Sequence, residues 1–144
     1  MRYRWSFLAL LAIAFVTTTT MNSPFAAEPT VQTNSAKITK LMQERRDVLE
    51  RRVQFLNNQF GNAKCTWIEV LGARDDLFVA ELDLATSRDA RVELLQSRVA
   101  NLKNAEEYAN SLKLAGRGDE SATLLATSKR LSAEIELEQE LSRE

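Results

Sequence analysis

Residues 80–102 read AELDLATSRDARVELLQSRVANL. Leu95, Val99 and Leu102 follow one another at steps of four and three residues. This is the spacing of one face of an α-helix, and not the alternation of a half-buried β-strand. The sequence TSRD at 86–89 contains a candidate helix N-cap. The stretch therefore forms either the middle of one long helix or the junction between two helices, and we favour the continuous helix.

The chain on both sides of this stretch has the composition of a helical protein. Alanine, leucine, glutamate, arginine, lysine and glutamine, which favour helices, predominate, and only four glycines interrupt them. Both prolines, Pro24 and Pro29, lie near the beginning. Apolar residues recur at three- and four-residue steps from Ile38 to Leu141. These patterns predict an all-α fold.

Two glycine-containing turns divide the helical region. After Phe60, Gly61 is expected to take the left-handed C-cap conformation, and Thr66 and Glu69 to form a capping box. The second turn reads AGRG at 115–118, and Asp119 is the expected N-cap that follows it. We predict long antiparallel helical hairpins of the coiled-coil type, with three helices and a middle helix about twice as long as its neighbours. The predicted helices cover residues 35–60, 67–114 and 119–142.

The sequence also repeats itself within this region. Leu41 recurs as Leu94, which sets an offset of 53 residues. The glycine turns match only with a slip of two residues, Gly61 against Gly116. We infer two repeats, at about 38–90 and 91–143, each consisting of helix, turn and helix. Further matches at the same offset are Gln43 with Gln96, Arg45 with Arg98, Leu49 with Leu102, Ala73 with Ala126, Ala80 with Ala133 and Glu81 with Glu134.

The first 27 residues follow the pattern of a secretory signal. Arg2 and Arg4 precede an apolar run from Trp5 to Val16, and small residues end the segment at Ala26 and Ala27. The run has about 12 residues, whereas a membrane span needs roughly 20. We expect cleavage after Ala27, export to the periplasm or cell envelope, a linker at 28–36 and a helical domain at 37–144. The alternative is an uncleaved membrane anchor.

The residues that usually perform catalysis are scarce. The sequence contains no histidine, which excludes a Ser–His–Asp triad and a Cys–His pair, and Cys65 is its single cysteine. We interpret Cys65 as an incidental loop residue, with an intermolecular disulfide as the alternative. The formal net charge of −1 argues against nucleic-acid binding. We expect no catalytic, cofactor-binding or metal-binding residues.

The charged residues are interpreted as solvated helix faces. Four carboxylates could form a metal site, but without histidine or the loop of a calcium site the structural interpretation is favoured. Arg117-Gly118-Asp119 spells a cell-adhesion tripeptide, although the turn and the N-cap account for its residues. A basic group on the first helix and an acidic group on the last are expected to attract one another. The carboxylates are Asp75, Asp76, Glu81 and Asp83, the basic group is Arg45, Arg46, Arg51 and Arg52, and the acidic group is Glu134, Glu136, Glu138 and Glu140.

Three aromatic residues, Phe60, Trp67 and Phe78, are expected to cluster around the first turn. One interpretation is core packing at the end of a hairpin. The other is an exposed hairpin tip that binds a partner protein. The three residues are therefore the candidate partner-binding site of the chain.

Each half of the chain carries a similar motif after its turn. The first runs from Phe60-Gly61 through VLGA at 70–73 to AELDL at 80–84, and the second from Gly116 through LLA at 124–126 to LSAEI at 131–135. These motifs resemble the helical hairpins of the outer-membrane efflux protein (TolC-like) family. The resemblance covers only that family's hairpin region, because the chain lacks the alternating strands of a barrel. It implies a module akin to the wall of a periplasmic tunnel, and it assigns no functional residue.

From these patterns we expect a non-enzymatic protein that acts by association of its helix faces, either with itself or with a partner in the cell envelope. It would serve as an efflux-like component or a coiled-coil adaptor, with no membrane span in the mature chain. The alternative is a soluble periplasmic structural or chaperone-like protein that holds partners in an apolar groove.

Overall fold

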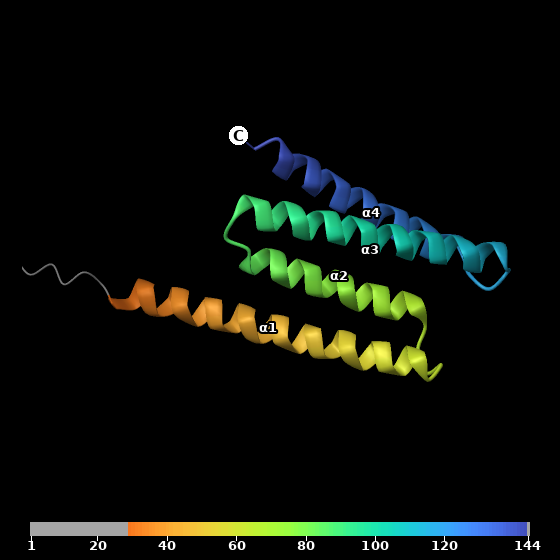
Figure 1. The fold of residues 1–144 in the computed structure, drawn as a ribbon, viewed down its shortest axis with the longest axis horizontal. Helices are drawn as coiled ribbons and strands as arrows, with labels where there is room; N and C mark the ends of the chain where they lie inside the picture. The colour runs from red at the N-terminus through yellow and green to blue at the C-terminus, as the bar shows by residue number, and fades with distance from the viewer. Residues whose placement is uncertain (1–28, 144) are drawn as a thin grey trace, which may run out of the picture.

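The chain folds into a succession of antiparallel α-helices (Figure 1). The computed structural model describes residues 29–143, so the predicted export signal lies outside the described residues. The described part contains four helices and no β-strand, which confirms the all-α prediction. The prediction of three helices is wrong. The helices are α1 (Pro29–Gly61), α2 (Trp67–Leu84), α3 (Arg88–Leu114) and α4 (Glu120–Leu141).

The expected long middle helix is interrupted between Leu84 and Arg88. Ala85 has extended backbone angles and ends α2. Ser87 begins α3 as an N-cap, because its hydroxyl accepts a hydrogen bond from the backbone N–H of Ala90 at 3.3 Å. The candidate N-cap at 86–89 therefore begins a helix, and the preference for a continuous helix is wrong.

Burial of apolar surface explains why the chain turns here. A continuous helix over 67–114 would extend about 72 Å and keep its two apolar halves apart. In the folded chain α2 lies against α3, and Leu71 and Leu95 are both almost fully buried. Burying one leucine side chain contributes roughly 1.5–3 kcal/mol, and a backbone hydrogen bond contributes about 0.5–1.5 kcal/mol, so several buried leucines offset the few hydrogen bonds lost at a capped break.

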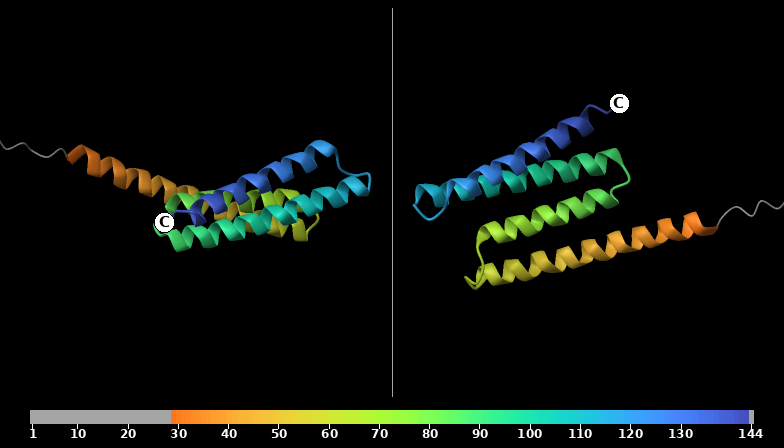
Figure 2. Two further views of the ribbon diagram at one scale, coloured as in Figure 1. Left: turned by 90° about the horizontal axis from the view of Figure 1, so that it is seen from above. Right: turned by 180° about the vertical axis from the view of Figure 1, so that it is seen from behind.

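Each helix packs against the next one along the chain. The contacting pairs are α1 with α2, α2 with α3, and α3 with α4. The right-hand view of Figure 2 shows the same serial order, with α1 at one side of the chain and α4 at the other. The two central helices therefore have neighbours on two sides, whereas α1 and α4 each pack against one helix.

The turn between α1 and α2 is closed by two backbone hydrogen bonds. The N–H of Lys64 donates to the carbonyl of Gln59 at 2.8 Å, and that of Ala63 to Phe60 at 2.9 Å. This pair of bonds defines a Schellman motif, in which the residue after the C-cap is left-handed. That residue is Ala63, with φ of 55°, and not Gly61 as predicted, because Gly61 is still the last residue of α1.

The turn between α3 and α4 has the same hydrogen-bond pattern. The N–H of Arg117 donates to Leu112 at 2.8 Å, and that of Gly116 to Lys113 at 3.0 Å. Gly116 occupies the left-handed position with φ of 68°. The carboxylate of Asp119 then accepts from the N–H of Ala122 at 2.7 Å, so Asp119 is the N-cap that the sequence predicts.

The structural landmarks of the two hairpins lie 53 residues apart. The slip between the turn glycines disappears, because the counterpart of Gly116 is Ala63 and that of Gly61 is Leu114. An ion pair between helices recurs in the same way, since Arg45–Asp83 and Arg98–Glu136 both have nitrogen–oxygen distances of 2.7 Å. Other counterparts are the ends of α1 and α3 (Gly61, Leu114) and the N-caps of α2 and α4 (Thr66, Asp119).

The core lies mainly along α2 and α3. Among the described side chains of α1, none is buried, and α4 contributes only two small apolar residues. The two residues of α4 are alanines, whose small side chains allow α4 to approach α3 closely. The buried apolar residues are Val70, Leu71, Ala73, Ala80 and Leu82 of α2, Leu95, Val99, Leu102, Ala105 and Ala109 of α3, and Ala126 and Ala133 of α4.

Candidate interaction surfaces

The aromatic tip predicted from the sequence is only partly assembled. The rings of Phe60 and Trp67 pack with their centroids 5.0 Å apart, and the guanidinium of Arg74 lies 5.1 Å from the centre of the Trp67 ring. Phe78 follows Trp67 by three helical turns on α2, which places it about 16 Å further along the helix. The structure therefore brings Phe60 and Trp67 together at the turn but not Phe78. Whether the tip binds a partner stays a prediction.

Cys65 lies in the same turn. Its thiol donates to the carbonyl of Leu56 at 3.3 Å. Burial and the negative charge of Glu69 raise the pKa of the Cys65 thiol. Glu69 itself accepts hydrogen bonds from the backbone N–H and hydroxyl of Thr66, which lower the pKa of its carboxyl group. The thiol is thus kept in its neutral form, which is a poor nucleophile and metal ligand.

The four carboxylates of α2 point to different neighbours. Asp76 pairs with Arg52 at 2.6 Å and Asp83 with Arg45 at 2.7 Å, so both face α1. Asp75 faces the other way and pairs with Arg98 of α3. Burial raises the pKa of Glu81, an effect that Arg46 opposes and Glu50 reinforces. The three aspartates join α2 to its neighbours, and each forms a separate contact.

Asp75 lies at the centre of a buried polar network. Its carboxylate is 2.8 Å from Nε of Arg98 and 3.6 Å from Nζ of Lys129, and the side chains of Asp75 and Arg98 are only 7% and 12% exposed. Beside it, the amide of Asn101 donates to the carbonyl of Leu71 at 2.9 Å. The prediction that the carboxylates lie on solvated faces is wrong here. The signal was that Asp75 falls in register with Leu71, Phe78 and Leu82.

The expected attraction between the arginines of α1 and the glutamates of α4 does not occur within one chain. Glu136 pairs with Arg98 of α3, and Glu140, which is buried, is 3.2 Å from Arg91 of α3. The four-helix arrangement explains this result, because α1 and α4 pack on different neighbours. Arg45 and Arg52 accordingly pair with α2, and Glu136 and Glu140 pair with α3.

An apolar stripe runs along the outside of α1. Leu41, Val48 and Phe55 are spaced by seven residues, and Ile38 precedes Leu41 by three, so the four lie on one side of the helix. All four side chains are at least half exposed. We call this set the α1 stripe.

A second stripe lies on α4. Leu124, Leu131 and Ile135 share one side of the helix and are exposed. Leu131 and Ile135 also line a shallow hollow that extends to Glu138 and Ser142. We call Leu124, Leu131 and Ile135 the α4 stripe. The sequence identified these residues as apolar but did not show which of them would remain uncovered.

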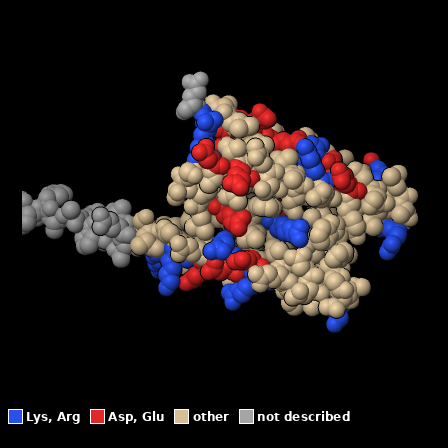
Figure 3. Space-filling view, in the orientation of Figure 1, with Lys and Arg blue, Asp and Glu red and all other residues tan. Residues whose placement is uncertain are grey.

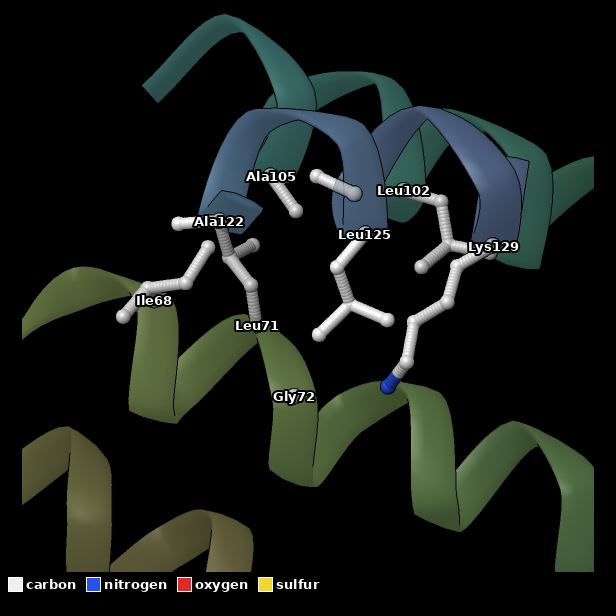
Figure 4. Close-up of a pocket in the computed structure, with 9 residues that line it drawn as sticks. Ile68, Leu71, Gly72, Leu102, Ala105, Ala122, Leu125 and Lys129 are labelled. Carbon is white, nitrogen blue, oxygen red and sulfur yellow. The ribbon is translucent and has the colours of Figure 1, made fainter. Parts of the chain in front are cut away.

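Figure 4 shows an apolar pocket where α2, α3 and α4 meet. Its volume is about 150 Å³, and the side chain of Lys129 extends from α4 toward α2 at its edge. Lys129 there reaches the carboxylate of Asp75. The lining residues are Ile68, Leu71, Gly72, Leu102, Ala105, Ala122, Leu125, Ala126 and Lys129.

Comparisons with known proteins leave the geometry as the basis for a functional argument. No protein family model, no curated protein and no solved structure matches this chain. The resemblance to outer-membrane efflux proteins therefore stays a prediction. Within residues 29–143, no helix combines the length and hydropathy that a membrane span requires.

Proposed function

We propose that this chain is an exported, non-enzymatic helical-hairpin protein of the cell envelope that acts by association through α1 and α4. The observation that carries the proposal is the pair of apolar stripes. Val48 and Leu124 are 54% and 61% exposed, although they belong to continuous apolar faces. Contiguous exposed apolar surface of this kind typically marks an interaction site.

The charged side chains support a binding role because several of them are engaged in contacts between helices of the chain. Asp75, Asp76 and Asp83 each hold an arginine of a neighbouring helix, and Glu106 accepts from both Thr127 and Arg130. These groups fix the arrangement of the helices. The surface left for a partner is apolar and helical, which suits recognition of another amphipathic helix.

Export and an efflux-related role form the cellular part of the proposal. Their support is the signal pattern in residues 1–27 and the hairpin motifs described above. The test is to express the full sequence in a Gram-negative host, fractionate the cells and determine the N-terminus of the product. We expect an envelope or periplasmic product that begins at Glu28. A cytoplasmic product that retains Met1 would contradict export.

The binding part is tested by site-specific photo-cross-linking in the same cells. A photoreactive residue replaces Val48 or Leu124, and Leu114 serves as the control because it is 89% exposed but belongs to neither stripe. We expect discrete cross-linked products from the two stripe positions and none from position 114. Equal cross-linking at all three positions, or none at the stripes, would refute association through these faces.

The apolar pocket favours a second candidate function, in which the chain holds apolar segments of other proteins. Leu125 is exposed and lines the pocket. The test is suppression of aggregation of an unfolded model protein by the wild type, by Leu125→Asp and by the control Leu114→Asp. The chaperone-like function predicts that only Leu125→Asp loses the effect. If the wild type does not suppress aggregation, this candidate is rejected.

A further inference from the structure

The interface between α2 and α3 has a counterpart on the outer faces of the molecule. At this interface Asn101 donates to the carbonyl of Leu71, and Arg91 donates to that of Leu82 at 3.1 Å. Moving each residue by the offset of 53 gives Val48 and Ile38 on α1, and Leu124 and Ile135 on α4. These are members of the α1 and α4 stripes. The two stripes are thus the same faces that α3 and α2 present to each other inside the chain.

Burial differs sharply between the two sets of positions. Leu71 and Leu82 are 1% and 7% exposed, whereas their counterparts Leu124 and Ile135 are 61% and 57% exposed. Repeat proteins usually end in a polar outer face. Here the outer positions are apolar even where the inner ones are polar, since Val48 replaces Asn101. The end faces therefore have the composition of an interface and not of a cap.

We propose that the occupant of both stripes is a second copy of this chain, with α4 of one copy packed antiparallel on α1 of the next in the register that α2 adopts on α3. This inference rests on the proposed function and names the partner. The contact between copies repeats the contact between α2 and α3. In the assembly, α1 of the next copy lies beside α4 just as α3 lies beside α2 within one chain.

The distribution of charge fits this orientation. The end of α2 adjoins the beginning of α3 (Figure 1), so the end of α4 would adjoin the beginning of α1. Lys37 and Lys40 are exposed near the beginning of α1, and Glu138 is exposed near the end of α4. Figure 3 shows basic side chains near the start of α1 and acidic ones along α4. These lysines and Glu138 would then attract one another between copies.

The proposed contact joins two different faces, so it is heterologous. Such contacts produce rings or open filaments, whereas a two-fold dimer places the same face on both sides. Cross-linking can therefore distinguish a heterologous contact from a two-fold contact. A residue of the α1 stripe should approach a residue of the α4 stripe of another copy, and never its own equivalent.

The experiment uses cysteine pairs and a short bismaleimide cross-linker. Two variants are made in the Cys65→Ser background, one with Val48→Cys and one with Leu124→Cys. Each is expressed from the full sequence and purified in the form that the cell produces. We expect a covalent dimer when the two preparations are mixed. Each preparation treated alone should give no covalent dimer. One chain with both cysteines should give a ladder of covalent oligomers. Leu114→Cys in place of Leu124→Cys is the matched control, and it should give no dimer.

Each other outcome overturns the inference. Dimers from Val48→Cys alone or Leu124→Cys alone would show a two-fold contact instead. If no sample cross-links but photoreactive residues at 48 and 124 capture a different protein in cells, the second copy is the wrong occupant and the proposed function stands. If neither method yields a product, both proposals fail. Circular dichroism of each variant checks that its helices are intact.

Discussion

At the scale of single residues, two arginines at corresponding repeat positions form ion pairs in very different environments. Arg98 and Asp75 form a pair that is almost fully buried, whereas Arg45, the counterpart of Arg98, pairs with the half-exposed Asp83. A buried charge whose partner is removed stays uncompensated in a medium that solvates it poorly. An exposed charge is hydrated again by water. The two pairs should therefore contribute unequally to stability.

Removing the buried carboxylate should cost far more than removing the exposed one. We expect Asp75→Ala to lower the free energy of unfolding by about 1.5–3 kcal/mol, because Arg98 would lose its buried partner and keep only the half-exposed Glu136. Asp83→Ala is the matched control and should cost only about 0–1 kcal/mol. Urea unfolding followed by circular dichroism measures both. Similar losses for the two variants would show that the Asp75 network is not decisive.

Ala63 should respond favourably to substitution by glycine. A left-handed alanine costs roughly 1–2 kcal/mol, and glycine adopts that conformation without the clash of a Cβ atom. We expect Ala63→Gly to raise the free energy of unfolding by about 1 kcal/mol. The control Ala100→Gly, at an exposed position inside α3, should lower it by about 0.5–1 kcal/mol. The same urea series checks both, and destabilisation by Ala63→Gly would disprove the assigned turn geometry.

Glu106 should make stability depend on acidity. Hydrogen bonds from Thr127 and Arg130 hold the pKa of the Glu106 carboxyl below its usual value of 4.5, so folding favours its charged form. The resulting stabilisation is present above pH 4.5 and is lost as the pH falls through the lowered pKa. Glu106→Gln should be less stable at pH 7 and lose less on acidification. Thermal unfolding between pH 7 and pH 3 tests this, and parallel curves for the two proteins would contradict it.

At the scale of the helices, the break before α3 depends on a local cap as well as on packing. The hydroxyl of Ser87 accepts from the N–H of Ala90. We expect Ser87→Ala to reduce the free energy of unfolding by about 1 kcal/mol, the usual contribution of an N-cap. Ser97→Ala, at an exposed position within α3, should have little effect or stabilise slightly. Equal effects of the two substitutions on urea unfolding would show that the cap is unimportant.

The helices themselves were predictable, because their signals are local. The apolar period gave the all-α fold, and Asp119 and the Thr66–Glu69 pair marked two helix starts that the structure contains. The number of helices could not be predicted from local signals alone. Good helix formers surround residues 85–87, and the cap at Ser87 makes a break favourable only together with the packing of α2 on α3.

Tertiary context also explains the errors at single positions. Asp75 has an ordinary helical sequence around it, and its burial follows from α3 lying against that side of α2, with the side chain of Lys129 reaching it from α4. Ala63 takes a left-handed conformation that glycine or asparagine favours. A prediction based on residue type therefore places this conformation at the nearby Gly61. Phe78 was grouped with the turn aromatics by type, although the helical rise carries it away.

At the scale of the whole molecule, serial packing leaves two end helices with uncovered apolar faces. The central helices α2 and α3 each have two neighbours, whereas α1 and α4 have one. The stripes on the end helices repeat, at an offset of 53 residues, the faces that pack together inside the chain. A chain built in this way can join copies of itself by the contact it already uses internally.

The most direct test of this account is light scattering coupled to size-exclusion chromatography, performed over a range of protein concentrations on the wild type, Leu124→Asp and Leu114→Asp. We predict that the wild type and Leu114→Asp exceed the mass of one chain and grow with concentration. Leu124→Asp should have the mass of one chain at the same concentrations while keeping its helical circular dichroism. A wild type that has the mass of a single chain at every concentration would contradict the central claim.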